Sequence, residues 1–278
     1  MTPANGRLLW VAAGAFLLGV VAVVIVLLMR RDEAAPPPVR TAQAAVPAPP
    51  PEPADIRSRP AAAQLAAAFE AAFHGRPPAT RMVGDNEIVY RPARLLWIGE
   101  RAVLVSAGAN SFGCHVCAGL LAVHYLEPQG SGFRVTGEWL DGGGSGSWGQ
   151  PPDWQFSTLL SPQPMIRNDG GDGGQGYFCT WIQFRELALA GPHEIANVQT
   201  GYSDTGALRE GGTPPTEFEG AIRNVVGGRS FDVVYRVRNF ALQRGAFVPA
   251  GSRRLTEHYV LRGGRYVLSR GETRVPTC

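Results

Sequence analysis

The sequence predicts a mainly β fold, at the margin of the α+β class: an antiparallel meander or sandwich-like domain with one short N-terminal helix, preceded by a single transmembrane helix. Three observations predict this fold. Apolar and polar residues alternate along several stretches of the chain, with the period of a half-buried strand. Glycine pairs separate some of these stretches, as in tight hairpin turns. No strand–helix–strand alternation is visible, so we expect antiparallel pairing.

The N-terminus consists of a short segment, residues 1–7, and an apolar run, residues 8–29, that has no charged side chain. A helix of these 22 residues would be about 33 Å long, enough to cross a hydrocarbon core of about 30 Å. A cleaved signal peptide is the alternative, but its apolar run is usually shorter, and here Arg30 and Arg31 follow directly. We therefore expect an uncleaved single-pass anchor that contacts membrane lipid through residues 8–29.

Residues 30–60 form a Pro/Ala-rich linker that contains nine of the 23 prolines. Such a segment favours the extended polyproline II helix and cannot bury a core. One arginine precedes the anchor and three follow it, and the positive-inside rule taken alone places the domain in the cytoplasm. The long spacer and a close cysteine pair point outward instead. We expect an inner-membrane anchor with the domain on the periplasmic side of a bacterial-type envelope.

A short helix is expected directly after the linker. Leu65, Phe69 and Phe73 recur at every fourth position of an Ala-rich stretch and form one apolar stripe. Pro60 suits the first turn of this helix, and Gly75 suits its end. We expect the stripe to pack on the rest of the domain.

Strands are expected through the remainder of the β-rich domain, residues 61–278, which is long enough for one domain or two subdomains. The expected strands include residues 102–106, 120–126, 133–139, 177–189, 231–237, 257–261 and 265–269. Glycine-containing connections are expected at residues 127–132, 226–229 and 262–264. Glycine adopts the positive φ that tight turns require without steric cost.

The composition excludes several classes of function. All 26 basic residues are arginine, so a P-loop, a Schiff-base enzyme and the Ser-x-x-Lys acyl-transfer motif, which need lysine, are excluded. Residues 61–278 hold 20 Arg and 19 acidic residues, so the domain is near neutral although the chain has a net charge of +3. A nucleic-acid-binding domain would show a basic excess, and we expect no nucleic-acid partner.

The four cysteines are Cys114, Cys117, Cys179 and Cys278. An even number in an exported domain favours structural disulfides, and of the three connectivities we consider a bond from Cys114 or Cys117 to Cys179. The first two also have the C-x-x-C spacing of a redox dithiol. However, a strand is expected after them, haem attachment needs His directly after the second Cys, and zinc needs a second close ligand pair. We expect structural disulfides, no metal and no cofactor.

Two motifs resemble catalytic signatures and fail. His193-Glu194 begins like the helix of a zinc protease, but Asn197 stands where the second His is required. Residues 201–206 approach the Gly-x-Ser-x-Gly nucleophile pattern but have the second Gly one place late. A Ser–His–Asp triad would have to use His124, His193 or His258, and the sequence does not select one of them.

Two glycine-rich stretches are expected to be loops. Residues 168–176 resemble a calcium site in composition but lack the EF-hand register, so we expect a flexible connection between strands. Residues 142–149 include Trp148 and lead into Asp153 and Trp154, and aromatic rings on glycine loops can bind a sugar or a peptide. The alternative is that these rings cover one end of the sheet core.

These expectations favour a binding or scaffold module over an enzyme. We expect a membrane-anchored envelope module whose partner is a protein, a peptide or a glycan. The rival class is an enzyme, either an envelope thiol–disulfide oxidoreductase that uses Cys114 and Cys117 or, less favoured, a cell-wall hydrolase.

Overall fold

The computed structural model describes residues 55–114, 117–208 and 213–271. The predicted segment 1–7, the predicted anchor, most of the predicted linker and Cys278 lie outside these ranges. Within the ranges described, no helix is both long enough and apolar enough to span a bilayer.

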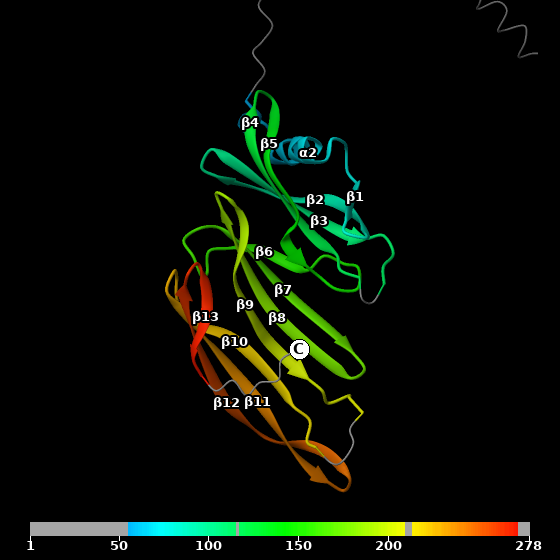
Figure 1. The fold of residues 1–278 in the computed structure, drawn as a ribbon, viewed down its shortest axis with the longest axis vertical. Coiled ribbons are helices and arrows are strands. Elements are labelled where there is room, and N and C mark those ends of the chain that lie inside the picture. Colours follow the sequence, from blue (N-terminus) through cyan, green and yellow to red (C-terminus); the bar gives the residue numbers. More distant parts are fainter. Residues whose placement is uncertain (1–54, 115–116, 209–212, 272–278) are drawn as a thin grey trace, which may run out of the picture. The chain divides into compact units, whose positions relative to one another are not determined.

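The described residues contain one α-helix and thirteen strands in two antiparallel sheets (Figure 1). The helical elements are η1 (Ile56–Ser58) and α2 (Ala61–Phe73). The first sheet consists of β1 (Ala79–Val83), β2 (Asn86–Ile98), β3 (Arg101–Asn110), β4 (Leu120–Gln129) and β5 (Gly132–Ser145). The second sheet consists of β6 (Asp153–Ser157), β7 (Met165–Gly174), β8 (Tyr177–Ala188), β9 (Gly191–Ser203), β10 (Glu217–Val226), β11 (Ser230–Gln243), β12 (Ala246–Arg262) and β13 (Arg265–Arg270).

In both sheets, strands that follow one another in the sequence lie side by side. The predicted mainly β, antiparallel fold with one short helix is therefore confirmed.

Helix α2 packs through the apolar stripe that the sequence predicts. Phe69 and Phe73 are buried, and their ring centroids lie 4.5 Å apart. Pro60 is the N-cap residue, one position before the first turn. His74, rather than Gly75, ends the helix in the left-handed region, with φ 57°.

β3, in the middle of the first sheet, is buried on both faces. Successive side chains of a strand point to opposite faces of a sheet. Leu104 of β3 packs in the core beneath α2, whereas Val103 and Val105 pack with Ile166 and Leu187 of the second sheet. Because both faces are covered, β3 has the continuous apolar run that predicted it as a strand.

The second sheet has a hydrophobic core of its own, and the side chains of alternate residues of β11 lie in it. Phe231 and Val233 are fully buried there, as the period-two pattern predicts. The buried Glu257 carboxylate accepts hydrogen bonds from the hydroxyls of Tyr235, at 3.1 Å, and Tyr259, at 2.8 Å. Burial, and to a smaller extent the Glu257 charge, raises the pKa of Tyr235, so this hydroxyl remains a proton donor.

The glycine-rich stretch at residues 168–176 is mostly strand, so the predicted flexible loop is wrong. Its residues up to Gly174 belong to β7. A Cβ atom on Gly170 would overlap the indole of Trp181 on β8, so this glycine makes room for a large ring within the sheet. The connection to β8 consists of Gln175 and Gly176, both at positive φ.

Two of the predicted turns are present, and one is shorter than expected. Gly263 and Gly264, at φ 57° and 81°, connect β12 and β13. The expected connection at residues 127–132 is reduced to Gly130 and Ser131, because β4 and β5 pair as far as this turn. Positive φ at these glycines matches the tight turns of right-twisted hairpins.

Candidate functional site

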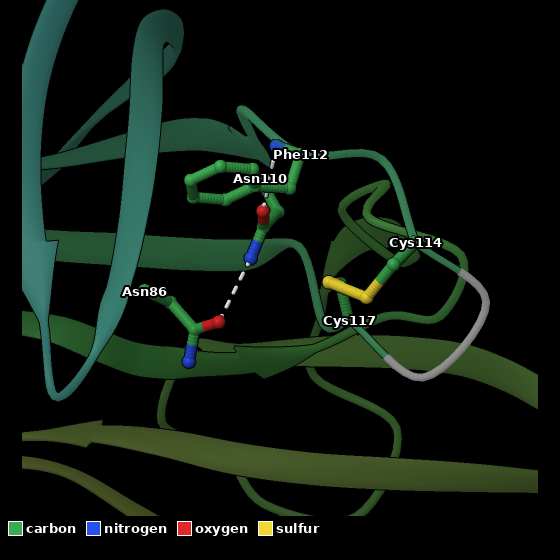
Figure 2. Close-up of a disulfide and its surroundings, with 5 residues drawn as sticks. All are labelled: Asn86, Asn110, Phe112, Cys114 and Cys117. Atoms are coloured by element: carbon green, nitrogen blue, oxygen red, sulfur yellow. Dashed lines mark hydrogen bonds between the residues drawn. A yellow bond between two sulfur atoms is a disulfide. The ribbon is translucent and has the colours of Figure 1, made fainter.

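Cys114 and Cys117 form a disulfide between β3 and β4, with their Cα atoms 5.0 Å apart (Figure 2). The backbone N–H of Cys117 donates to the carbonyl oxygen of Cys114 at 3.1 Å, and this turn brings the two side chains together. The bond that we considered between either of them and Cys179 is therefore not formed. Cys179 lies on β8, opposite Asp172 and Tyr202, and is not a free thiol.

The buried Asn110, the last residue of β3, holds the start of the disulfide segment (Figure 2). Its Nδ2 donates to Oδ1 of Asn86 at 3.0 Å, and its Oδ1 accepts from the N–H of Phe112 at 2.9 Å. The N–H of Ser111 donates to the carbonyl oxygen of Glu87 at 3.0 Å. The Asn110 amide thus connects Phe112 of this segment to Asn86 of β2.

A second loop, which follows β5, pairs with the disulfide segment through its backbone. The N–H of Gly149 donates to the carbonyl oxygen of Cys117 at 2.7 Å, and the carbonyl oxygen of Gly149 accepts from the N–H of Asn110 at 2.8 Å. The N–H of Gly146 donates to the carbonyl oxygen of Gly119 at 2.8 Å. We call residues 111–114, 117–119 and 146–152 the paired loops.

The paired loops pack closely against each other at two positions where glycine has no side chain. A Cβ atom on Gly119 would overlap the backbone of Gln150 and Pro151. A Cβ atom on Gly146 would overlap the same backbone segment. Backbone groups cannot move aside as a flexible side chain can, so these two positions require glycine.

Two large aromatic side chains are exposed on the paired loops. Phe112 is 78% exposed, and Trp148 is 54% exposed. Trp148 also has φ 55°, a left-handed conformation that costs a non-glycine residue about 1–2 kcal/mol. Strained residues of this kind concentrate at functional sites. Phe112 was not singled out from the sequence, where its position two residues before Cys114 was the available signal.

The other predicted surface residues lie on the next strand. β5 continues through Ser145, so the loop predicted at residues 142–149 begins later than expected. Trp154, on β6, is partly buried against the core between the two sheets, with its ring centroid 5.3 Å from that of Phe156. Asp153 is exposed at the start of β6. The structure therefore brings Trp148, but not Trp154, to the surface beside the disulfide.

The described part of the paired loops has no charged side chain. A reactive dithiol usually has a thiol pKa lowered by a helix N-terminus or a nearby cation. Cys117 is followed by β4, not by a helix, and both cysteines are partly buried. The side chains that the structure describes in the paired loops thus form an apolar surface.

The three histidines considered for a triad lie on three different strands, β4, β9 and β12. Nδ1 of His258 lies 2.6 Å from Oδ1 of Asp232, and Nδ2 of Asn224 donates to the other carboxylate oxygen of Asp232 at 2.7 Å. These two hydrogen bonds, that of Asn224 first, lower the pKa of Asp232. The hydroxyl of Ser269 donates to the backbone carbonyl of His258, not to its ring. Among the described contacts, His258 and Asp232 therefore form a His–Asp pair to which no serine or cysteine side chain is hydrogen-bonded through the His ring.

His124 is fully buried between β4 and α2, where its ring centroid lies 4.9 Å from that of Phe73. Its Nε2 lies 3.5 Å from Oε2 of Glu138, which is too long for a strong hydrogen bond. Burial lowers the pKa of His124 to about 4, and the Glu138 carboxylate opposes this change only in part. His124 is therefore a neutral core residue at pH 7.

No group of three or more His, Cys, Asp or Glu side chains in the ranges described could hold a metal ion. Comparisons of the chain with protein-family models, with curated proteins and with solved structures found no significant match. The chemistry of the paired loops is therefore what points to a function.

Proposed function

We propose that this chain is a membrane-anchored binding module of a bacterial-type envelope, which uses the paired loops to bind a protein partner. The observation that carries the proposal is the exposure of Phe112 and Trp148 on loops joined by backbone hydrogen bonds and a disulfide. Aromatic side chains on a rigid support provide a large contact area at little cost in conformational entropy.

The chemistry of the paired loops favours a protein over a glycan. Sugar recognition needs several polar groups that are available to the ligand. Asn110 uses both ends of its amide within the site, and the hydroxyl of Ser147 donates to the carbonyl oxygen of Gly171 at 3.0 Å. Ser111 and Gln150 are exposed polar side chains of these loops. The large exposed side chains are aromatic, and the described loops have no charged group, which is the character of the buried centre of a protein interface.

The sequence before the domain supports the membrane part of the proposal. Residues 8–29 are uncharged and long enough to cross a bilayer. A linker such as residues 30–60, when extended as polyproline II, reaches on the order of 90 Å. The anchor and the linker would keep the domain in the periplasm and let the paired loops meet a partner away from the inner membrane.

The test is site-specific photo-crosslinking with the full chain in its native membrane. Benzoylphenylalanine replaces Phe112, or Leu242 as a control that is 60% exposed on β11. We expect an adduct of one defined mass from position 112 and none from position 242. The adduct should disappear when Trp148 is changed to Asn, which tolerates the left-handed backbone of this position. Equal adducts from both positions, or an adduct that does not depend on Trp148, would refute the proposal.

The same site distinguishes the rival oxidoreductase, which the partly exposed C-x-x-C disulfide favours. An oxidoreductase would accumulate a mixed disulfide with its substrate in one of the two single variants, Cys114→Ser or Cys117→Ser, namely the one that keeps the attacking thiol and lacks the resolving thiol. A binding module would give no such species, and its adduct at position 112 would form in the oxidised chain. Trapping with and without reductant, followed by non-reducing electrophoresis, separates the two functions.

A further inference from the structure

A second surface, independent of the paired loops, lies along the edge of β2. β1 pairs with β2 only at Asn86–Tyr90, whereas β3 pairs with β2 as far as Ile98. The outer edge of residues 91–98 therefore has no strand partner in the ranges described. Alternate residues of such an edge present backbone N–H and C=O groups with which another chain can pair.

A proline and a bulge define the usable length of this edge. Pro92 has no N–H to donate, and the register with β3 shifts between Pro92 and Arg94. The five residues from Ala93 to Trp97 remain, and an edge of five residues spans about 16 Å. This length suits a short extended segment rather than a whole additional sheet.

Helix α2 lies beside this edge and encloses with it a groove of about 670 Å³. The helix side is lined by Ala61, Ala62 and Leu65, and the strand side by Leu95 and Trp97. The volume is within the range of about 300–1,000 Å³ that is typical of ligand sites. The small alanine side chains keep the groove open, and both of its walls offer apolar contacts.

The charged residues that line the groove are both basic, Arg57 and Arg94. Arg57 is held in place: its guanidinium forms an ion pair with Glu100 at 2.7 Å and lies 4.6 Å from the centroid of the Trp97 ring. Arg94 is exposed, and in the ranges described it forms no ion pair. The groove therefore offers one uncommitted cation next to an unpaired strand edge.

We propose that this groove binds an extended segment of a partner polypeptide by β-strand addition, with apolar side chains of the segment against Leu65 and Leu95 and a carboxylate against Arg94. Strand addition gives affinity through main-chain hydrogen bonds, and pockets for alternate side chains give specificity. Here the free edge of β2 offers the main-chain hydrogen bonds, and the apolar walls together with Arg94 offer the contacts for alternate side chains.

The test uses the full chain in detergent and immobilised hexapeptides that alternate apolar residues with varied residues. We expect peptides with one Asp or Glu to bind best, and methylation of alternate backbone nitrogens to abolish their binding. Arg94→Glu should weaken binding at least tenfold, whereas Arg91→Glu, a change of another exposed arginine on the same strand outside the groove, should change it less than twofold. A peptide with Lys in place of the acid should restore binding to the Arg94→Glu variant.

A second pair of variants tests the groove itself. Ala62→Phe fills it from the helix side and should abolish peptide binding, whereas Ala66→Phe changes an exposed residue of the same helix outside the groove and should not. Absence of binding to every peptide, equal binding by the Arg94→Glu variant, or binding that survives backbone methylation would overturn the proposal. Trp148→Asn should leave peptide binding unchanged, so a failure here is distinct from a failure of the paired loops.

Discussion

Replacement of His124 by Leu should change how the stability of the domain depends on pH. His124 is fully buried against α2, and its surroundings favour the neutral ring. Burial has the largest effect on its pKa, and Arg81 acts in the same direction. The Glu138 carboxylate acts in the opposite direction and is outweighed, because the pKa falls to about 4. Leucine is of similar size and cannot titrate.

Whether the free energy of unfolding rises or falls with pH depends on which state, folded or unfolded, binds the proton. In the unfolded chain the His pKa is about 6.5, so between pH 6.5 and pH 4 the unfolded state is protonated while the folded state is not. The free energy of unfolding must therefore fall as the pH falls through this window. At about 1.4 kcal/mol per pH unit, the interval from 6.5 to 4 amounts to about 3 kcal/mol.

The assay is urea unfolding of the full chain in detergent between pH 7 and pH 4, followed by near-ultraviolet circular dichroism. Carboxylates titrate in the same range, but they are common to the wild type and the variant, so the difference between the two isolates His124. We expect the His124→Leu variant to gain about 3 kcal/mol relative to the wild type from pH 7 to pH 4.

Parallel curves for the wild type and His124→Leu over this range would show that His124 binds a proton as readily in the folded as in the unfolded chain, contrary to this prediction. Titration of the His124 ring near pH 6.5 in the folded chain, followed by magnetic resonance, would contradict it as well. Either result would mean that water or Glu138 stabilises the charged ring more than its burial destabilises it.

Two further predictions concern the paired loops. Changing both Cys114 and Cys117 to Ala should lower the free energy of unfolding by about 2 kcal/mol, because the bond closes a very short loop; thermal unfolding in oxidising buffer measures this loss. Gly119→Ala should lower the free energy of unfolding by about 2–3 kcal/mol, because the added Cβ would overlap the backbone of Gln150. Gly75→Ala, where no atom lies near the added Cβ, should change it by no more than about 0.5 kcal/mol in the same assay.

The helix and the hairpins could be predicted because their signals are local. The stripe that includes Phe69 and Phe73 depends only on helical period, and the Gly263-Gly264 turn depends only on the freedom of glycine at positive φ. Each of these features is determined within about one turn of chain. Tertiary contacts then stabilise such elements, but they do not decide where in the sequence the elements form.

Local patterns do not predict the structure where a glycine is needed for packing instead of a turn. Gly170 lies within β7 because the indole of Trp181 occupies the space that a side chain would take. The reason for this glycine is therefore on the neighbouring strand, in a contact that depends on register. A local pattern cannot distinguish it from a glycine in a flexible loop.

The candidate site could not be assembled from the sequence because two bulges decide its geometry. A regular hairpin that continued from the Gln129–Gly132 pair would place Leu120 opposite Asp141, but register shifts within β4 and β5 place it opposite Ser145 instead. This shift sets the end of β5 beside the start of β4, so that the loop with Trp148 meets the disulfide segment. Bulges redirect strands near functional sites. Here they bring the Cys114–Cys117 segment and the glycine-rich stretch with Trp148, which are separate in the sequence, onto one surface. A change in β4 or β5 that removed a bulge should therefore move Trp148 away from the disulfide.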